Sequence, residues 1–481
     1  MSKSLALLAA FLATLSTGSE PIEIGRRTQF FVDDYMVDNR WSLKPKTEEV
    51  VRAFHAPLKH HANPVIAGEG GYVSAVKEMD TGRIKLWYQV ARPKRDGKGA
   101  DYGVAYAESK DGIRFERPVL NLVEWQGSKA NNIVWRGSTG RGASGAQIVR
   151  APESARRGFR YRLAYHSSGA VKGRSGICIV GSQDGIHWDA AGESLIVSLH
   201  SDTVNSIVHD SDRGTYVMFC RPKDRYLVRG AGDFLKTGES RRIARRSGTD
   251  LWKPWTGEPE TILIPDEFDM QCGFNRFYGM HARWHEGIYW GALLCFKLNT
   301  DITTELAWSR DGWHFDRLPL RPKMYNLGPP NAWDDGMVCG SMDWMEMGDR
   351  WFLYYAGHDG PHESRDRTPG IGLAILRKEG FISLRGPRGG GVVCTKLLRW
   401  PGGDLVINAN ASAGELKVRV SDKTRKPVPG YDYADGAPFQ ADRTDHVVRW
   451  KERPLDALRG QSIRLECFLR DADLFTFQAR L

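Results

Sequence analysis

Short runs in which apolar and polar residues alternate fill most of the chain, and turn-forming residues separate them. The segment 72–90, "YVSAVKEMDTGRIKLWYQV", has the pattern of a strand, a turn at "MDTGR" and a second strand, and "YGVAYAES" at 102–109 continues the alternation. A period of two residues places successive side chains on opposite faces of a sheet. The pattern therefore predicts strands, while signals for helices are sparse along the whole chain.

This group of strands returns four times, in segments that start near residues 146, 203, 278 and 336. Units of this kind, repeated along a chain, are typical of a β-propeller in which each unit forms one four-stranded blade. Past residue 385 the repeat stops and the strands become shorter, which predicts a small antiparallel sandwich. The predicted fold class is all-β: a five-bladed β-propeller over residues 20–385, followed by a small C-terminal β-sandwich over 386–481.

The repeats also share the motif Ser-x-Asp-Gly-x-x-aromatic. It reads "SKDGIRF" from Ser109, "SQDGIHW" from Ser182 and "SRDGWHF" from Ser309, with a degraded copy, "SGTDLW", from Ser247. Aspartate bonds to nearby backbone N–H groups and glycine tolerates positive φ, so these residues suit a tight turn. A catalytic motif normally occurs once in a chain. Repetition therefore favours a structural role for this motif.

The N-terminal segment has the form of a secretory signal peptide. Lys3 is followed by an apolar run from Leu5 to Leu15 and then by small polar residues. This apolar core is too short to span a bilayer comfortably, and no later run approaches about 20 apolar residues. We predict that residues 1–19 are removed on export, which gives a secreted or periplasmic protein with no membrane association afterwards.

Charge and cysteine content narrow the choice of partner. The formal net charge is +10, which for an exported protein favours anionic partners such as acidic or sulfated glycans. There is no long block of lysine and arginine and no nucleic-acid motif, so no nucleic-acid partner is predicted. The seven cysteines stand singly at irregular spacing, which predicts neither a disulfide framework nor a cysteine metal site. The oligomeric state stays open.

Candidate catalytic residues stand just before the first strand of each unit, because this strand lies beside the axis of a propeller. Acidic residues occur there in units one, three and five, as Glu69, Asp202 and the pair Asp334–Asp335. Carboxylates gathered around one axis repel one another, which raises some of their pKa values. Glycoside hydrolysis needs one protonated carboxyl and one ionised carboxyl. We therefore predict Glu69, Asp202 and Asp335 as the catalytic residues.

Further polar residues are expected to contact the substrate around the same axis. The pair Asp33–Asp34 is expected on a strand that closes the ring. The loop 52–66, "RAFHAPLKHHANPVI", contains two adjacent histidines, which point in opposite directions on an extended chain and so disfavour a metal site. We predict no metal and no cofactor, and leave a structural Ca²⁺ at the axis open. The predicted substrate-binding residues are Asp34, His60, Asn63, Arg221, Asp269, Arg276 and Asp334.

At this point the chain resembles the five-bladed propeller glycoside hydrolases of families 32 and 43, and in particular the exported family-32-like proteins of planctomycete-type bacteria. The resemblance rests on "TGRIKLWYQ", "YAESKDGIRFERP", "LAWSRDGWHF" and the C-terminal strands, and it extends over nearly the whole mature chain. It implies an exported O-glycosyl hydrolase that acts on an oligo- or polysaccharide. A plant or algal glycan is expected, and the net charge favours an anionic one.

The catalytic motifs of family 32 are replaced in this sequence. "GEGGYVS" stands where the family has Asn-Asp-Pro-Asn-Gly, so Glu69 takes the place of the nucleophile. "SDTVNS" stands for Arg-Asp-Pro, so Asp202 takes the place of the stabiliser, one blade later than the family pattern. The Glu-Cys-Pro-Asp acid motif has no counterpart, and "CGFNRFYGM" offers Arg276 instead. Retention or inversion stays open.

Three alternatives remain from the residues alone. The chain is a glycan-binding propeller without catalysis, a polysaccharide lyase with His60 and Arg276 as base and clamp, or a sialidase-like enzyme whose arginines Arg221 and Arg276 hold a carboxylate. A tyrosine–glutamate nucleophile pair of the sialidase kind cannot be picked out from the sequence. A glycosidase of the usual kind needs two carboxyls about 5–10 Å apart. A lyase needs a base beside a cationic clamp.

Overall fold

The computed structural model describes residues 20–42, 49–94, 99–140, 142–155, 157–171, 174–222, 241–298, 300–364, 366–451 and 453–481. The predicted signal peptide, 1–19, lies outside the described residues. Over the described ranges the chain is nearly all-β, with one short α-helix, α2 (Glu267–Gln271). No helix in these ranges is long and apolar enough to cross a membrane. The chain divides into two compact units, 56–378 and 1–55 with 379–481.

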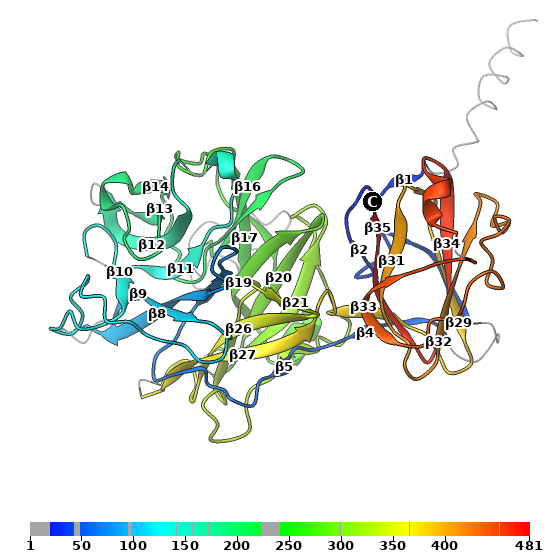
Figure 1. Cartoon of the computed structure of the whole chain (residues 1–481). Coiled ribbons are helices and arrows are strands. Elements are labelled where there is room, and N and C mark those ends of the chain that lie inside the picture. The colour runs from blue at the N-terminus through cyan, green and yellow to red at the C-terminus, as the bar shows by residue number, and fades with distance from the viewer. Residues whose placement is uncertain are drawn as a thin grey trace, which may run out of the picture. The chain divides into compact units, whose positions relative to one another are not determined.

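The unit 56–378 begins with three successive sheets of four antiparallel strands (Figure 1). In each sheet the strands follow one another in sequence, as the alternating pattern predicts. Their strands are β7 (Val73–Lys77), β8 (Ile84–Pro93), β9 (Ala100–Ser109) and β10 (Ile133–Trp135); β11 (Ser144–Ile148), β12 (Tyr161–Val171), β13 (Arg174–Ser182) and β14 (Ser194–Val197); and β15 (Ser206–Asp210), β16 (Thr215–Cys220), β17 (Ile243–Gly248) and β18 (Glu260–Leu263).

A sheet of eleven strands completes this unit and contains two further antiparallel groups, which meet at the parallel pair Ile302–Met337. The first group is β19 (Arg276–His285), β20 (Ile288–Phe296), β21 (Ile302–Ser309), β22 (Asp316–Arg317) and β23 (Lys323–Tyr325). The second is β24 (Met337–Gly340), β25 (Met345–Met347), β26 (Arg350–His358) and β27 (Pro369–Arg377), joined by β5 (Leu58–Lys59) and β6 (Ile66–Ala67).

The first strands of these five groups, β7, β11, β15, β19 and β24, are called the inner strands below. On each of the first four inner strands, one side chain accepts a hydrogen bond from a backbone N–H of the next group. The donor and acceptor pairs are Ile148 N–H to Ser74 Oγ (3.1 Å), Ile207 N–H to Gln147 Oε1 (3.1 Å), Ala282 N–H to Ser206 Oγ (2.7 Å) and Met342 N–H to His281 Nδ1 (3.1 Å). These bonds satisfy buried backbone groups that no sheet ladder reaches.

The last group is joined back to the first. β27 pairs with β5 and β6, which precede β7 in the chain. The hydroxyl of Tyr354 on β26 donates to the carbonyl of Gly112, in the turn that follows β9, over 2.7 Å. The closing strands are thus within 58–67. The prediction that Asp33 and Asp34 lie on the closing strand is wrong, because those residues belong to the other compact unit.

The Ser-x-Asp-Gly motif forms the same turn in its three full copies. Ser109 Oγ accepts from the N–H of Gly112 over 2.9 Å, and Asp111 Oδ1 accepts from the N–H groups of Ile113 and Arg114. The copies at 182–187 and 309–314 repeat these bonds. The only sheet pairing of residues 113–118 in the described chain is the isolated bridge Glu108–Glu116, and the fourth strand of the first group is β10.

The second unit has two six-stranded sheets and one shared core. Strands from the N-terminal segment pair with C-terminal strands, so residues 20–55 fold with 379–481, whereas the sequence pattern grouped them with the repeat. The strands are β1 (Ile22–Glu23), β2 (Gln29–Phe30), β3 (Val37–Ser42), β4 (Val51–Phe54), β28 (Ile382–Arg385), β29 (Gly391–Thr395), β30 (Leu398–Arg399), β31 (Asp404–Asn410), β32 (Glu415–Ser421), β33 (Asp442–Val447), β34 (Ser462–Arg470) and β35 (Asp473–Arg480).

Candidate functional site

Asp202 stands in a cluster of cations, phenols and imidazoles near the N-terminal ends of the inner strands. Its loop, between β14 and β15, packs closely on β11. Gly145 has φ +60°, and a Cβ there would lie 1.8 Å from the carbonyl oxygen of Thr203, so only glycine permits this approach. We define the Asp202 cluster, from its hydrogen bonds, ion pairs and electrostatic contacts, as Tyr72, Tyr102, His200, Asp202, Arg221, Arg241, Tyr278 and His362.

Cations hold Asp202 in its ionised form. Arg221 Nη1 lies 2.7 Å from Oδ1, and His200 Nε2 lies 4.0 Å from Oδ2. Burial by itself raises the pKa of Asp202, but the charges of Arg221, Arg241 and His200 outweigh burial and lower the pKa below its ordinary value. The carboxylate side chain is 42% exposed, so a ligand in solution can reach it.

Tyr278, at the start of β19, forms a chain of hydrogen bonds with two loop residues. Its hydroxyl lies 3.0 Å from Nε2 of His362, and Nδ1 of His362 lies 2.9 Å from Oε1 of Glu363. A carboxylate only accepts hydrogen bonds, so Nδ1 carries the proton and Nε2 accepts from the phenol. We call this arrangement the Glu363–His362–Tyr278 relay.

Hydrogen bonds to backbone carbonyl groups fix the loop that contains His362 and Glu363. The N–H of His362 donates to the carbonyl of Thr300 over 2.9 Å. Nη1 of Arg367 donates to the carbonyl of Ser364 over 2.7 Å and also to the carbonyl of His362. These bonds fix the imidazole against Tyr278, with ring centroids 5.1 Å apart. The relay is therefore positioned before any ligand arrives.

Burial and charge set the protonation states of the relay. Burial lowers the pKa of His362, and the hydrogen bond to Glu363 acts in the opposite direction, with a net lowering that leaves a neutral imidazole at pH 7. Burial raises the pKa of Tyr278 to about 12, while the charge of Arg241 opposes this rise. The Arg241 guanidinium carbon lies 4.1 Å from the centre of the Tyr278 ring. Arg241 is thus placed to stabilise a phenolate when His362 removes the proton.

The groups are those of an activated nucleophile: a hydroxyl that can give up its proton, a neutral base in contact with it, and a third group that orients the base. The phenol oxygen can attack an electrophilic carbon or remove a proton from carbon. The ionised Asp202 can stabilise positive charge or accept a proton. Arg221 and Arg241 can bind a carboxylate or sulfate on the substrate.

Of the predicted site residues, the structure brings Asp202 and Arg221 together. Glu69 lies in the loop before β7, where its Oε2 accepts from the Tyr88 hydroxyl over 3.1 Å and lies 3.4 Å from Arg117. Neither partner belongs to the Asp202 cluster. Arg276 is the first residue of β19 and faces Phe296 in the ladder.

Two other predicted residues, Asn63 and Asp334, lie where the last strand group is joined back to the first. The buried carboxylate of Asp334 pairs with Lys59 over 2.5 Å and accepts from the Tyr355 hydroxyl over 3.0 Å. Asn63 makes two hydrogen bonds to the backbone of Leu373 on β27. These contacts give both residues a structural role, and substrate binding by either of them stays a prediction.

The other two predicted residues near this junction, His60 and Asp335, accept hydrogen bonds from backbone N–H groups close to them in sequence. Nδ1 of His60 accepts from the N–H of Ala62 over 3.2 Å. Asp335 Oδ2 accepts from the N–H of Asn331 over 2.7 Å.

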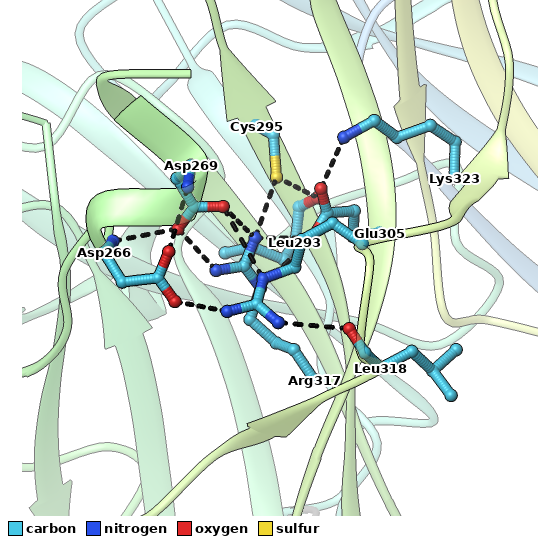
Figure 2. A network of polar contacts seen from close by, with 9 residues as sticks. Asp266, Asp269, Leu293, Cys295, Glu305, Arg317, Leu318 and Lys323 are labelled. Atoms are coloured by element: carbon cyan, nitrogen blue, oxygen red, sulfur yellow. Dashed lines mark hydrogen bonds and ion pairs between the residues drawn. The ribbon is translucent and has the colours of Figure 1, made fainter. Parts of the chain in front are cut away.

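Asp269 belongs to a buried charge network on α2 and the neighbouring sheet, as Figure 2 shows. Both of its carboxylate oxygens pair with Arg317 over 2.6 Å, and Arg317 also reaches Glu305. Asp269 and Asp266 cap the start of α2 reciprocally. With 1% of its side chain exposed, Asp269 is held by contacts within the protein, which favours a structural role over the predicted role in substrate binding.

Asp34 lies in the other compact unit, where Arg52 Nη2 approaches its Oδ1 to 2.7 Å and Arg40 lies 3.7 Å away. Burial raises its pKa, but Arg52 and Arg40 produce a net lowering. This ion-pair role needs no ligand.

Sequence reasoning missed most of the cluster, namely the three tyrosines, Arg241, His200 and His362. The four side chains that accept from the next strand group, those of Ser74, Gln147, Ser206 and His281, are called the ring-bonding residues below. Tyr72 and Tyr278 stand two and three residues before Ser74 and His281, so a polar aromatic residue at this position was a usable signal. His362 and Arg241 lie on connections outside the repeat, so no pattern in the repeat points to them. In the described part of the chain, no group of three or more His, Cys, Asp or Glu has a metal-binding arrangement.

No family model matches the chain, and no curated protein sequence matches it. Among solved structures, an N-acetylgalactosamine deacetylase from F. plautii in complex with blood group B trisaccharide is 15% identical, with a TM-score of 0.45 over 68% of this chain and 95% of that one. The RS223 β-xylosidase is 15% identical, with a TM-score of 0.41 over 67% of this chain and 94% of that one.

A family 43 arabinoxylan arabinofuranohydrolase from Bacillus subtilis in complex with cellotetraose is 12% identical, with a TM-score of 0.38 over 88% of this chain and 98% of that one. All three TM-scores lie below 0.5.

Proposed function

We propose that the chain is an exported glycosidase that cleaves an anionic glycan with a tyrosine nucleophile, on a five-bladed β-propeller followed by a small β-sandwich. The observation that carries this proposal is the Glu363–His362–Tyr278 relay, which stands beside Arg241 and Asp202. It differs from the scheme that the sequence suggested, in which two or three carboxylates share the chemistry.

The bonds between inner strands support the propeller. Four successive groups are joined to the next by the same side-chain-to-backbone contact, and β5, β6 and Tyr354 join the fifth group to the first. A closed ring of five antiparallel groups leaves only short, protected sheet edges. This geometry supports one blade for each group.

In the first step, the Tyr278 oxygen attacks the anomeric carbon while His362 Nε2 takes the phenol proton. The new bond joins the anomeric carbon to the Tyr278 oxygen, and the bond to the leaving oxygen breaks. Arg241 and the imidazolium formed on His362 offset the charge that develops on the phenol oxygen. Glu363 holds the imidazolium through Nδ1.

Asp202 supplies the proton for the leaving oxygen after the substrate has bound. In the free protein, Arg221 and Arg241 keep its pKa low. An anionic group on the substrate pairs with these arginines and so removes part of the positive field at Asp202. The pKa of Asp202 then rises toward the range that a general acid needs.

In the second step, water attacks the anomeric carbon and the bond to Tyr278 breaks. Asp202 takes the proton from this water, and His362 returns its proton to the Tyr278 oxygen. Both groups are then in their starting states. Two displacements at one carbon retain its configuration, so the proposal predicts a retaining enzyme.

One observation favours a second candidate, elimination from a uronate. Arg241 lies next to the activated phenol, and a lyase needs a base beside a cationic clamp. In that reaction the phenolate takes the proton from the carbon next to the carboxylate, and the electrons of that C–H bond expel the leaving oxygen as a double bond forms. The product is an unsaturated sugar, which hydrolysis does not give.

The experiment is a cleavage screen of the mature protein on neutral, uronate-containing and sulfated glycans, followed by reducing-sugar release and mass spectrometry. Asp202→Asn and Glu69→Gln are assayed beside the wild type, with Asp366→Asn as a control on an exposed carboxylate. Hydrolysis of acidic glycans that Asp202→Asn abolishes and Asp366→Asn leaves intact supports the proposal.

Other outcomes assign the site differently. Ultraviolet-absorbing unsaturated products establish the lyase reaction. Loss of hydrolysis in Glu69→Gln, with folding intact, returns the chemistry to the carboxylates near β7. Glycan binding without cleavage by any form contradicts an enzymatic role.

A further inference from the structure

A pocket lies beyond the ring-bonding residues, toward the C-terminal ends of the inner strands. It has a cavity volume of about 50 Å³ and is partly open to solvent. Arg150, His209 and Trp284 each stand three residues after a ring-bonding residue, whereas Tyr72 and Asp202 of the first cluster stand before one. The two sites are therefore at opposite ends of the inner strands. We call this the Arg283 pocket, after one of the two arginines that line it.

Arg150 pairs with the carboxylate of Asp343, whereas Arg283 contacts the carbonyl and the ring of Trp344. Arg150 Nε lies 3.4 Å from Oδ1 of Asp343, and its Nη2 donates to the carbonyl of Ala75 over 2.9 Å. Arg283 Nη1 donates to the carbonyl of Trp344 over 2.8 Å, and its guanidinium carbon lies 3.9 Å from the centre of that ring. Asp343 is 4% exposed.

The remaining groups near the pocket do not supply a second negative charge. His281 lies 3.6 Å from Asp343, but its Nδ1 accepts from Met342 N–H and burial lowers its pKa, so the ring is neutral at pH 7. The carboxylate of Glu346 pairs with Lys378 over 2.9 Å. Two positive charges thus face one negative charge around this pocket.

Water solvates the positive charge of Arg283 poorly. Burial lowers the pKa of Arg283 to about 9, and repulsion by Arg150 adds to this effect. A desolvated guanidinium is stabilised by an anion that offers two oxygens to its planar donors. Gln147 also lines the pocket, and because its Oε1 already accepts from Ile207 N–H, its amide N–H₂ is the group it can offer.

We propose that the Arg283 pocket binds a small oxyanion group, a sulfate, phosphate or carboxylate, between Arg150 and Arg283. Nothing in this proposal depends on the reaction at the Asp202 cluster. The oxyanion is either a free inorganic ion or an acidic group on a glycan chain, because both present the same oxygens.

The test measures binding to the mature protein by isothermal titration calorimetry and by thermal unfolding. The probes are sodium sulfate, sodium phosphate and a sulfated oligosaccharide, and sodium chloride at equal ionic strength controls for general salt effects. Arg150→Gln and Arg283→Gln remove one donor group each. Arg114→Gln changes an exposed arginine outside the pocket, and Arg241→Gln removes a cation of the first cluster.

The wild type is expected to bind an oxyanion, and each pocket variant to bind it at least about tenfold more weakly, because a charge-assisted hydrogen bond is lost. Arg114→Gln is expected to match the wild type, and Arg241→Gln to leave this binding event in place. A selenate-soaked crystal then shows the anion between the two arginines. Response to inorganic ions identifies a free ion as the ligand, and response to the oligosaccharide alone identifies a glycan group.

Two results overturn the proposal. The first is wild-type protein whose Tm and heats follow ionic strength only. The second is oxyanion binding that survives in both Arg150→Gln and Arg283→Gln but disappears in Arg241→Gln, which assigns all anion binding to the first cluster. Arg150 is 42% exposed, so Arg150→Gln keeps the test decisive even where Arg283→Gln fails to fold.

Discussion

The hydroxyl of Tyr278 contacts Nε2 of His362 over 3.0 Å, although 84 residues separate the two in sequence. Tyr278 comes from an inner strand, and His362 comes from the loop between β26 and β27. Their contact joins the fourth and fifth strand groups at the place where Asp202 arrives from the third. The proposed reaction depends on this meeting of three groups.

Glu363→Gln tests the relay through pH dependence. Burial lowers the pKa of His362 and Glu363 raises it, so loss of this charge lowers the pKa further. Because His362 must be neutral to act as base, the acidic limb of kcat/KM lies below about pH 6.5 and is expected to move to still lower pH in the variant. The maximal rate is expected to fall about tenfold or more, because the imidazole is no longer held.

The measurement is the pH–rate profile of both proteins, with Glu116→Gln as a control on an exposed glutamate. An acidic limb that stays in place, or moves to higher pH, contradicts the role of Glu363.

Asp269→Asn is expected to reduce stability and to leave KM unchanged. The substitution removes the carboxylate that pairs with both Nη atoms of Arg317, and breaking a buried ion pair from one side costs about 3–5 kcal/mol. Urea unfolding measures the loss. Glu267→Gln, on the exposed side of the same helix, is the matched control. A raised KM with full stability would restore Asp269 as a substrate contact.

Ser206→Ala tests the bonds between inner strands. Ser206 Oγ accepts from the N–H of Ala282 over 2.7 Å, and the variant leaves that buried N–H without its acceptor, at a cost of about 1–3 kcal/mol. The loss is measured by urea unfolding against Ser198→Ala, an exposed serine. Equal stability of the two variants would show that the bond contributes nothing to the ring.

Stability is also expected to fall as the pH drops below about 6.5. Burial lowers the pKa of His281 and lowers the pKa of both His285 and His358 to about 3. The unfolded chain binds protons at these histidines first, so each contributes stability that is complete above pH 6.5 and is lost toward the folded pKa, at up to about 1.4 kcal/mol per pH unit.

Aspartates with lowered pKa values, such as Asp184 and Asp311, change the stability only near and below pH 3.8, the ordinary pKa of this side chain. Between pH 6.5 and about 4.5 the slope therefore belongs to the histidines. Urea unfolding at several pH values measures it, and a flat profile in this window contradicts the buried neutral state of these rings. His281→Gln is expected to reduce the slope.

The repeated turn was the most predictable part of the fold. Ser109, Asp111 and Gly112 carry their own hydrogen bonds in a local stretch, so the sequence motif contains the cause of the structure. The strand order within each group follows for the same reason. The pairing that joins the last strand group to the first could not be predicted. It is made by β27 and residues 58–67, and neither segment carries a local signal for the other.

The site was predictable only where a residue stands at a regular position of the repeat. Asp202 precedes an inner strand and follows from the pattern, whereas Asp269, which also stands before an inner strand, turned out to cap α2. Arg241 and His362 lie on connections between strands, where length and conformation vary. Their meeting with Tyr278 is a tertiary contact that no single stretch of sequence specifies.

The central claim is that Tyr278 is the nucleophile, and the most direct test is kcat for Tyr278→Phe on the best acidic glycan from the screen. Phenylalanine keeps the ring against Arg241 and removes only the oxygen. The account predicts a loss of at least about 10³-fold in kcat with Tm close to that of the wild type, and full activity in the exposed-tyrosine control Tyr35→Phe. Hydrolysis by Tyr278→Phe within about tenfold of the wild-type rate would contradict it.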